Sequence, residues 1–382
     1  KKLEIIKIKN NGKKLRKSFP NPTYFIEGFF LIKLITNEHV SGLGELNPYC
    51  GSTAEIRKIL KLIFYEIKNK NIKSINLQKM HNFIEKKFKN NVCVNSCIAA
   101  ISQSLVDIDG KNKKKEASTL FNKSKYRSQQ ILAYASGGMI FENQDLNILI
   151  EEALSCKSQN FFGWKFRPPF PNKIDKHQNR IKNPPFFNLN ELISFSKKLR
   201  LKLGENFKLM VDLGSRCQNI KDANYLIDAL NELNFFFIEE PLPRKLSLYL
   251  KLKNKNLLAA GEHFCSAKEA TNWINKKALK IIQLDTNLMD LNNIYELNGF
   301  FKRKKINFIP HNWGNLVNSS ANLNLLKSLD KKDKIIEFSI YNNPYDDIFI
   351  NKAFYLKKGK VCFKKYHGLG IELNNKNLKK YL

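Results

Sequence analysis

The stretch FKLMVDLGSR (207–216), followed by FFFIEEPLP (235–243) and LLAAGEHF (257–264), decides the fold of this chain. Each of the three segments holds a short apolar run, and an acidic residue stands at or just after its end, namely Asp212, Glu239 or Glu262. Amphipathic sequence of helical spacing separates the runs. Short apolar runs that alternate with helices predict parallel β-strands joined by helical crossovers.

The same alternation extends in both directions, so that eight runs follow one another. The predicted strands are Ile131–Tyr134, Phe161–Phe166, Phe207–Val211, Phe235–Ile238, Leu257–Ala260, Lys280–Leu284, Asn307–Pro310 and Lys334–Phe338. Eight such units over about 250 residues indicate a closed α/β barrel of the TIM type. The Pro- and Asn-rich insertion at 168–186 predicts a loop, and NNPYDD (342–347) predicts that the last barrel helix is short, displaced or absent.

The first 120 residues have a different pattern. KLEIIKIK (2–9) alternates, and YFIEGFFLIKLI (24–35) is followed by a Gly-rich return, which predicts a strand and a hairpin. Apolar spacing predicts three helices, at Ala54–Lys68, Gln78–Phe88 and Ser96–Asp109. We therefore expect an α+β module at 1–125, a barrel at 126–345 and a C-terminal segment at 346–382.

The chain carries 66 Lys and Arg against 34 Asp and Glu over 382 residues, a formal charge of +32. Lysine is abundant together with Asn, Ile and Phe and is spread along the whole chain, which indicates biased composition and solvated faces more than a nucleic-acid site. No helix-turn-helix or RNP-type signature supports sequence-specific binding of nucleic acid. With 43% hydrophobic residues the chain can bury a core, which excludes wholesale disorder.

Membrane and secretory signals are not expected. The most apolar stretch that we single out, Tyr24–Ile35, is too short for a membrane span and is interrupted by Glu27 and Lys33. The opening KKLEIIKIKN (1–10) predicts a strand and not a signal peptide. Seven scattered cysteines without a CxxC pair indicate reduced thiols, so we expect a cytoplasmic location.

Ionisable residues stand at or near the ends of seven consecutive predicted strands. They are Lys165, Arg167, Asp212, Glu239, Glu262, Asp285, His311 and Glu337. Because the carboxyl ends of parallel barrel strands converge on one mouth, we expect these side chains to face one cavity. Charges at such positions cost desolvation free energy unless they are used, so their number points to an active site.

Three of these residues, Asp212, Glu239 and Glu262, fall on adjacent strands. Carboxylates brought together in this way repel one another unless a cation neutralises them. Oxygen ligands without Cys or His fit Mg²⁺ best. The residues therefore predict a Mg²⁺ site.

Two further pairs suit acid/base chemistry on an anion. Asp285 and His311 end neighbouring strands, where the carboxylate can orient and charge-stabilise the imidazole as a general acid/base. Lys165 and Arg167 are two residues apart, so both side chains point to the same side of their strand. These two cations would either bind an anionic substrate or pair with the carboxylates opposite.

With these residues in place, the chain resembles the enolase superfamily, and within it the mandelate-racemase-like branch. The matching segments are GLGELNPYCGST (42–53), CIAAISQSLVDIDGK (97–111), AYASGG (133–138), WKFR (164–167), LMVDLGSR (209–216), FFIEEPLP (236–243), AAGEHF (259–264), IIQLD (281–285), PHNWG (310–314) and HGLGIEL (367–373). The resemblance implies a modified (β/α)7β barrel under an N-terminal α+β capping domain that the C-terminal segment completes.

The resemblance also assigns roles. It implies Mg²⁺ on Asp212, Glu239 and Glu262, with Glu239 as the ligand of the doublet Glu239–Glu240. It implies that Asp285 and His311 form the catalytic dyad and that Glu337, when protonated, donates to an oxygen of the intermediate. The other main branch, of the muconate-lactonising and dipeptide-epimerase type, carries a Lys where this chain has Asp285, which argues against that branch.

Two departures from the family pattern bear on the reaction. Lys165-Phe-Arg167 stands where the branch commonly shows Lys-x-Lys, and an Arg is a poor base. Gly214 stands where the family often has Asn, which leaves room for a larger or differently placed substrate. Racemisation needs an acid/base on each face of the substrate, whereas a dehydratase can manage with His311 alone.

We therefore expect a Mg²⁺-dependent dehydratase that converts an aldonate- or aldarate-like acid sugar to its 2-keto-3-deoxy product through an enediolate. The alternative is a racemase or epimerase that uses Arg167 or an unseen residue as second base, and a basic nucleic-acid-binding protein is a remote alternative. Tyr49 in the loop Pro48–Thr53, Arg216 and the 168–186 insertion are expected to shape specificity for a small anionic sugar acid. Members of the family are usually oligomeric, so a homo-oligomer is expected.

Overall fold

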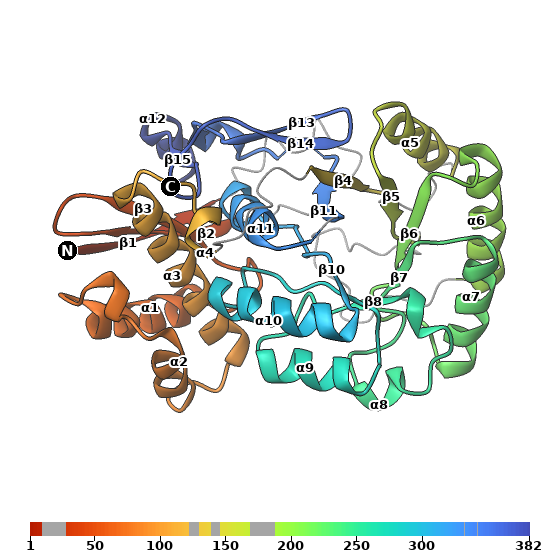
Figure 1. Cartoon of the computed structure of the whole chain (residues 1–382), viewed down its shortest axis with the longest axis horizontal. Helices are drawn as coiled ribbons and strands as arrows, with labels where there is room; N and C mark the ends of the chain where they lie inside the picture. The colour runs from red at the N-terminus through yellow and green to blue at the C-terminus, as the bar shows by residue number, and fades with distance from the viewer. Residues whose placement is uncertain (10–27, 122–129, 139–145, 169–187, 332, 342) are drawn as a thin grey trace.

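Figure 1 shows the computed structural model of the chain, in which a smaller N-terminal part lies beside a barrel. The structure describes residues 1–9, 28–121, 130–138, 146–168, 188–331, 333–341 and 343–382. The predicted 168–186 insertion lies outside the described residues except for Pro168. The division of the chain at residues 125 and 345 stays a prediction.

The N-terminal part, called the cap below, is a three-stranded antiparallel sheet packed on helices. Its elements are β1 (Lys2–Ile8), β2 (Phe29–Ile35), β3 (Ser41–Glu45), α1 (Thr53–Ile67), α2 (Leu77–Glu85), α3 (Asn91–Asn112) and the short α4 (Ser118–Phe121). The predicted strand, hairpin and three helices are all present, and α3 begins five residues before its predicted start at Ser96. Residues 24–27 of the predicted hairpin lie outside the described part.

Helix α3 lies directly against β3. A Cβ added to Gly42 would lie 2.1 Å from the Ser104 carbonyl oxygen, and one added to Gly44 would lie 2.0 Å from that of Ala100. Only glycine permits this approach, which explains the two glycines of GLGE. Among the described helices α3 alone is long and apolar enough to cross a membrane, but 89% of its apolar window is buried inside the protein. The prediction from the sequence concerned residues 24–35 and not this helix.

In the described part of the barrel, eight parallel strands follow one another in chain order. They are β4 (Ile131–Ser136), β5 (Gly163–Phe166), β6 (Lys208–Asp212), β7 (Phe237–Glu239), β8 (Leu258–Ala260), β9 (Ile281–Ile282), β10 (Asn307–Phe308) and β11 (Lys334–Ser339), and β11 pairs with β4. Each of the eight predicted strands is confirmed. Between β10 and β11 no ladder is present among the described residues, and Asn312 Nδ2 instead donates to the Glu337 carbonyl oxygen at 2.9 Å.

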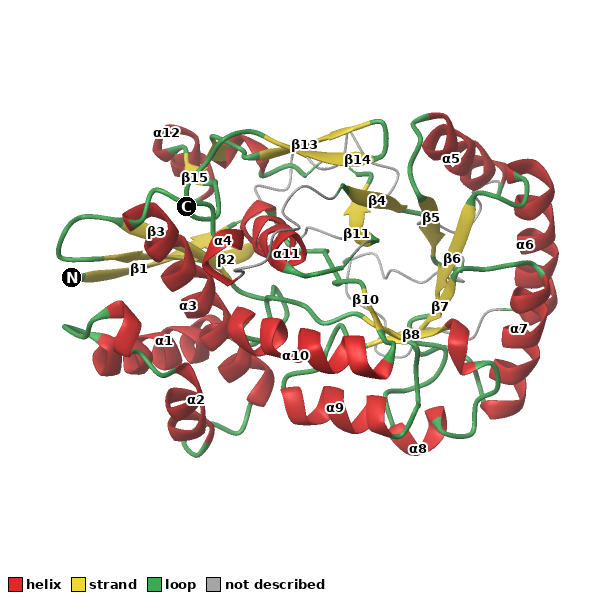
Figure 2. Ribbon diagram, viewed as in Figure 1, coloured by secondary structure: helices red, strands yellow, loops and turns green. Residues whose placement is uncertain are grey.

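Within the described residues, seven helices connect the strands, and they lie around the outside of the strands (Figure 2). They are α5 (Asn147–Ser158), α6 (Leu189–Leu203), α7 (Ile220–Glu232), α8 (Leu246–Tyr249), α9 (Ala267–Asn275), α10 (Leu291–Lys304) and α11 (Leu316–Ser328). No α-helix follows β11 within the described residues before α12 (Asn375–Leu378), and a 3₁₀-helix at Asp346–Ile348 comes first. The architecture is therefore the predicted (β/α)7β barrel, in which the last barrel helix is absent from its usual place.

An apolar layer inside the barrel supports the predicted site. It is formed by Tyr134, Met210, Phe237, Ala259, Ile281, Ile309 and Ile335. Met210 and Phe237 stand two residues before Asp212 and Glu239, so strand alternation puts the carboxylates on the same side, one layer nearer the carboxyl ends. The packed layer closes the barrel interior below the ionisable groups.

The C-terminal residues divide between the two parts. Tyr381 accepts a hydrogen bond from the Lys9 amide at 2.8 Å, and Asp107 in α3 accepts one from the Leu369 amide at 2.8 Å, so this segment completes the cap as expected. The hairpin β13 (Phe354–Lys357) and β14 (Lys360–Phe363) departs from that expectation. It pairs with the start of β4, because β5 pairs only with the end of that strand and leaves the start uncovered.

Candidate active site

The register of the strands brings two of the predicted metal ligands side by side. Asp212 at the end of β6 is paired with Glu239 at the end of β7. Glu262 follows β8 by two residues. Opposite them, Lys165 lies on β5, and the loops after β9 and β10 carry Asp285 and His311. Hydrogen bonds and ion pairs join six of the eight predicted site residues into two clusters, and Arg167 and Asp212 form a separate pair.

The first cluster surrounds the ammonium group of Lys165, which is only 2% exposed. Its Nζ lies 2.6 Å from Oε2 of Glu239 and 2.6 Å from Oε1 of Glu337. Burial alone would lower the pKa of Lys165, but the two carboxylates outweigh burial and raise it well above its usual value. Lys165 is therefore a permanently charged group held between two acids.

Glu337 is ionised in this arrangement. Besides Lys165, it accepts hydrogen bonds from the Asn312 amide at 3.1 Å and from Trp313 Nε1 at 2.7 Å. Burial raises the pKa of Glu337, but Lys165 and then His311 outweigh burial and lower it to about 2. The expected role of a protonated donor does not fit these contacts, because every one of them favours the carboxylate.

Arg167 is paired with a carboxylate as well. Its Nη2 lies 2.5 Å from Oδ2 of Asp212, and its side chain is 20% exposed, ten times more than that of Lys165. Of the two predicted cations, Arg167 is thus the one that solvent or a ligand can reach. In this structure Lys165 and Arg167 both pair with carboxylates, which was the second of the two alternatives for these cations.

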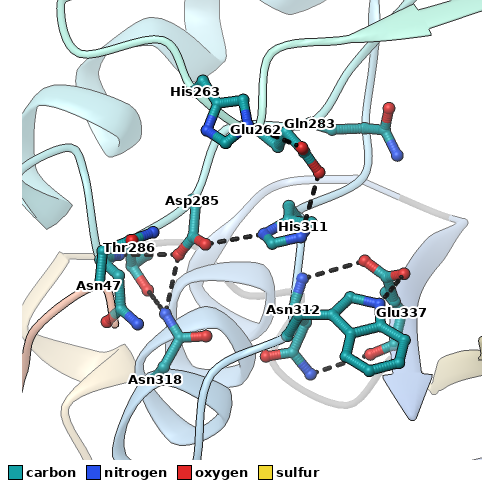
Figure 3. A network of polar contacts seen from close by, with 12 residues as sticks. Asn47, Glu262, His263, Gln283, Asp285, Thr286, His311, Asn312, Asn318 and Glu337 are labelled. Carbon is teal, nitrogen blue, oxygen red and sulfur yellow. Dashed lines mark hydrogen bonds and ion pairs between the residues drawn. The ribbon is translucent and has the colours of Figure 1, made fainter. Parts of the chain in front are cut away.

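The second cluster contains the predicted dyad (Figure 3). Nδ1 of His311 lies 2.7 Å from Oδ2 of Asp285, and Nε2 lies 3.2 Å from Oε2 of Glu262. Burial would lower the pKa of His311, but the charges of Glu262 and Asp285 raise it to about 10. The imidazole is therefore protonated in this arrangement.

Glu239 carries the evidence for a cation. Its Oε1 is buried and has no hydrogen-bond partner among the described residues, although Oε2 binds Lys165 and accepts from Gln283 Nε2 at 3.0 Å. Burial, followed by the charges of Asp212, Glu337 and Glu262, raises the pKa of Glu239 to about 8 despite Lys165. A buried carboxylate oxygen that lacks a donor and is crowded by other carboxylates is the kind of group that an oxygen-seeking cation stabilises.

A different trio lies closest together. The ligand atoms of Glu240, Glu262 and His263 all lie within 4.8 Å of one another. Asp212 and Glu239 do not join such a group among the described residues, because their side chains contact Arg167 and Lys165. Glu262 is common to both trios.

The two residues predicted to shape specificity lie in unlike places. Tyr49 is 48% exposed in the loop before α1. Arg216 is buried, and it donates to the carbonyl oxygens of Leu213 at 3.2 Å and Pro168 at 3.3 Å. It therefore braces the loops after β5 and β6, and its contact with a ligand stays a prediction.

Several residues that hold the site are not among those predicted from the sequence. Asn318 in α11 donates to Oδ1 of Asp285 at 2.8 Å, and Gln283 binds Glu239. Gln283 stands two residues before Asp285, so strand alternation was an available signal for it. Asn318 gives no such signal, because it lies inside a helix and 33 residues from its partner.

Comparisons with known proteins place this geometry in a family. The family model described as "Enolase C-terminal domain-like" matches residues 167–377. The chain is 22% identical over 303 residues to D-galactarolactone cycloisomerase of Agrobacterium fabrum, a match that covers 75% of this chain and 74% of that protein.

Solved structures share the fold over the whole chain. The 3,6-anhydro-D-galactonate cycloisomerase from Zobellia galactanivorans is 20% identical with a TM-score of 0.79, covering 100% of this chain and 99% of that one. A mandelate racemase/muconate lactonizing enzyme-like protein from Roseovarius is 17% identical with a TM-score of 0.83, covering 100% and 94%.

The fold and the strand-end residues together define a capped (β/α)7β barrel enzyme. The chain belongs to the enolase superfamily.

Proposed function

We propose that this enzyme removes the proton α to the carboxylate of a sugar acid and expels the oxygen on the β-carbon. The observation that carries the proposal is the position of His311. It is oriented by Asp285 at 2.7 Å, its side chain is 13% exposed, and its Nε2 faces the carboxylate of Glu262. Lys165 is 2% exposed and bound by two acids, so His311 is the better placed group for moving a proton.

In the proposed reaction, His311 starts as the neutral imidazole, a form that Mg²⁺ would favour by compensating the charge of Glu262. Its Nε2 then accepts the α-proton while Nδ1–H donates to Asp285. The electron pair of the broken C–H bond forms the enediolate, and its return expels the β-oxygen, to which His311 Nε2 delivers the proton. The resulting enol converts to a 2-keto acid. When the β-oxygen is a free hydroxyl, water leaves and the enzyme is a dehydratase.

The relatives favour a second form of the same elimination. Two of them are cycloisomerases of a galactarolactone and of an anhydrogalactonate. When the β-oxygen belongs to a ring, its expulsion opens the ring and no atom is lost, so the product is an isomer of the substrate. Both forms use the same residues, and the substrate alone decides between them.

The remaining residues of the site would bind the metal ion or the anionic substrate. Asp212, Glu239 and Glu262 would hold Mg²⁺, which when bound would supply positive charge to the enediolate and compensate the charge of Glu262 beside His311. Arg167, the accessible cation, would bind the substrate carboxylate, and Lys165 would add fixed positive charge from within the barrel wall. Arg167 stands where a racemase needs a second base, and a guanidinium with a pKa above about 12 rarely gives up its proton.

A substrate screen tests the proposal. Purified protein with MgCl₂ is incubated with open-chain aldonates and aldarates and, separately, with their lactones and 3,6-anhydro forms, and 2-keto acid is detected as its semicarbazone. Keto product from open-chain acids supports the dehydratase, and keto product from ring-containing acids supports the cycloisomerase. Exchange and inversion of the α-carbon in D₂O without keto product would instead support the racemase, and no change in any acid would contradict the proposal. A homo-oligomer and a cytoplasmic location stay predictions.

A further inference from the structure

A buried carboxylate of the cap contacts the barrel close to the dyad. Glu45, the last residue of β3, is fully buried. Its Oε1 accepts from the Asn315 backbone amide at 2.6 Å, and its Oε2 accepts from the Asn318 backbone amide at 3.1 Å. Glu45 and these two asparagines are at least 270 residues apart in the chain.

Through these contacts Glu45 is the hydrogen-bond acceptor at the N-terminus of helix α11. Asn315 occupies the N-cap position but makes no side-chain capping bond, and its Oδ1 accepts from Asn343 Nδ2 at 2.8 Å instead. The first backbone amides of a helix have no partner within the helix, and a carboxylate is the favoured acceptor at this positive end. Because both oxygens of Glu45 accept N–H groups, the carboxylate form fits this place.

The first turn of α11 in turn holds the dyad (Figure 3). The Nδ2 group of Asn318 donates to Oδ1 of Asp285 at 2.8 Å and to Oγ1 of Thr286 at 3.1 Å. The other oxygen of Asp285 binds His311. The backbone amide of Asn318 thus donates to Glu45 of the cap. Its side chain positions Asp285, the carboxylate that orients the imidazole of His311.

A second side chain of the cap, that of Gln103, also supports the carboxylate of Asp285. Oε1 of Gln103 in α3 accepts from the Glu45 amide at 2.8 Å, and its Nε2 donates to the Thr286 carbonyl oxygen at 2.8 Å and to Oδ1 of Asn287 at 3.0 Å. The Asn287 amide donates to Oδ1 of Asp285 at 2.8 Å. Both donors to this oxygen are therefore anchored on the cap.

We propose that Glu45 is a positioning residue, which fixes the first turn of α11 from the cap so that Asn318 aligns Asp285 with His311. This role rests on the proposed function, since it acts on the dyad that the function uses. In this role Glu45 acts on Asp285 through the first turn of α11, by its bonds to Asn315 and Asn318.

The test compares two cap-side carboxylates that contact the same helix at opposite ends. Glu45→Gln places an N–H donor where a backbone N–H must be accepted, at the turn that holds Asp285. Glu116→Gln removes an ion pair in which Oε2 of Glu116 lies 2.5 Å from Nζ of Lys327. Lys327 lies in the last turn of α11, far along the helix from the turn that holds Asp285. We expect Glu45→Gln to lower kcat about 10- to 100-fold with little change in KM, and Glu116→Gln to leave kcat within about twofold.

A readout without substrate separates this proposal from the proposed function. The Nδ1–H proton of His311, assigned in ¹⁵N-histidine-labelled protein by its loss in His311→Asn, reports the bond to Asp285. We expect this resonance to move in Glu45→Gln and to stay unmoved in Glu116→Gln. If no sugar acid reacts with the wild type, the proposed function fails while the resonance still decides the role of Glu45.

A second variant covers the case in which Glu45→Gln does not fold. Asn318→Ala removes the amide that contacts Asp285, and we expect it to move the same resonance and to lower kcat with no further loss in the double variant. A variant Glu45→Gln that only lowers Tm, or an Asn318→Ala protein in which the resonance is unmoved, would overturn the proposal.

Discussion

The guanidinium of Arg167 lies 2.5 Å from Oδ2 of Asp212, so the accessible cation of the site is paired with a carboxylate expected to hold the metal. The proposed reaction leaves Arg167 as a charge and not as a base. Arg167→Lys should restore a group that can lose a proton. We expect this variant to catalyse exchange and inversion at the α-carbon in addition to elimination. ¹H NMR of the substrate in D₂O measures both.

Arg167→Met is the matched control, because it removes both the charge and any base. We expect the Met variant to lose substrate affinity without gaining inversion. Inversion in the wild type at the rate of elimination would contradict the role given to Arg167.

The two overlapping acidic trios make opposite predictions about Mg²⁺. If Asp212, Glu239 and Glu262 hold the ion, Asp212→Asn should weaken Mg²⁺ binding at least about tenfold in calorimetric titration, because a charged ligand is lost. Glu240→Gln should then bind Mg²⁺ as the wild type does. Weak binding by Glu240→Gln together with normal binding by Asp212→Asn would assign the ion to Glu240, Glu262 and His263.

His311 should dominate the chemistry. Replacement by Asn keeps a polar side chain that can donate a hydrogen bond but removes the group that takes the proton, so kcat should fall by about 10²- to 10⁴-fold. His263 is the control, since it also contacts Glu262, at 3.0 Å, but its side chain is 42% exposed, against 13% for His311. His263→Asn should retain most of the activity, and equal losses in both variants would remove His311 from its assigned role.

Glu45 should make stability depend on pH. Burial, partly offset by hydrogen bonds from Asn315 and Asn318, raises the pKa of Glu45 from 4.5 to about 7. Between about pH 4.5 and 7 the folded protein therefore holds a proton that the unfolded chain releases, and above about pH 7 Glu45 is the carboxylate that accepts both backbone amides. The contribution of this proton to stability is present below about pH 4.5 and is lost as the pH rises to about 7. The free energy of unfolding of the wild type, relative to Glu45→Gln, should fall by up to about 3 kcal/mol across this window in urea titrations. A difference that is flat or rises with pH would contradict the assignment.

Gly44 should be intolerant of a side chain. A Cβ at this position would lie 2.0 Å from the Ala100 carbonyl oxygen, so Gly44→Ala must push β3 away from α3 and should cost about 1–3 kcal/mol of stability. Gly299 in helix α10 is the control, because the nearest atom to its added Cβ is an Arg303 side-chain nitrogen at 3.5 Å. Gly299→Ala should raise Tm, by the helix propensity of alanine, whereas a neutral Gly44→Ala would contradict the tight packing.

The barrel and most of its site could be predicted from the sequence, because both rest on short-range patterns. Each strand is a local apolar run, and each ionisable residue stands at or near the end of such a run, as Asp212 and Glu239 do. Strand order then places them together without knowledge of any single contact.

Long-range pairing could not be predicted in this way. The capping of α11 by Glu45 joins residues 270 positions apart, and no local pattern specifies it. The ionised state of Glu337 depends on which of several acids Lys165 approaches, a choice made by packing. The hairpin of β13 and β14 pairs with β4 only because the edge of that strand is left open at its start.

The bonds from Glu45 to Asn315 and Asn318 also limit how such enzymes can be recombined. A chimera that joins the cap of one relative to the barrel of another would separate this carboxylate from the helix end that it contacts in its own protein. The smallest exchangeable unit is then the cap together with the first turn of α11, although Glu45 and Asn315 are 270 residues apart in the sequence. Substrate-range engineering by cap exchange should therefore carry both pieces at once.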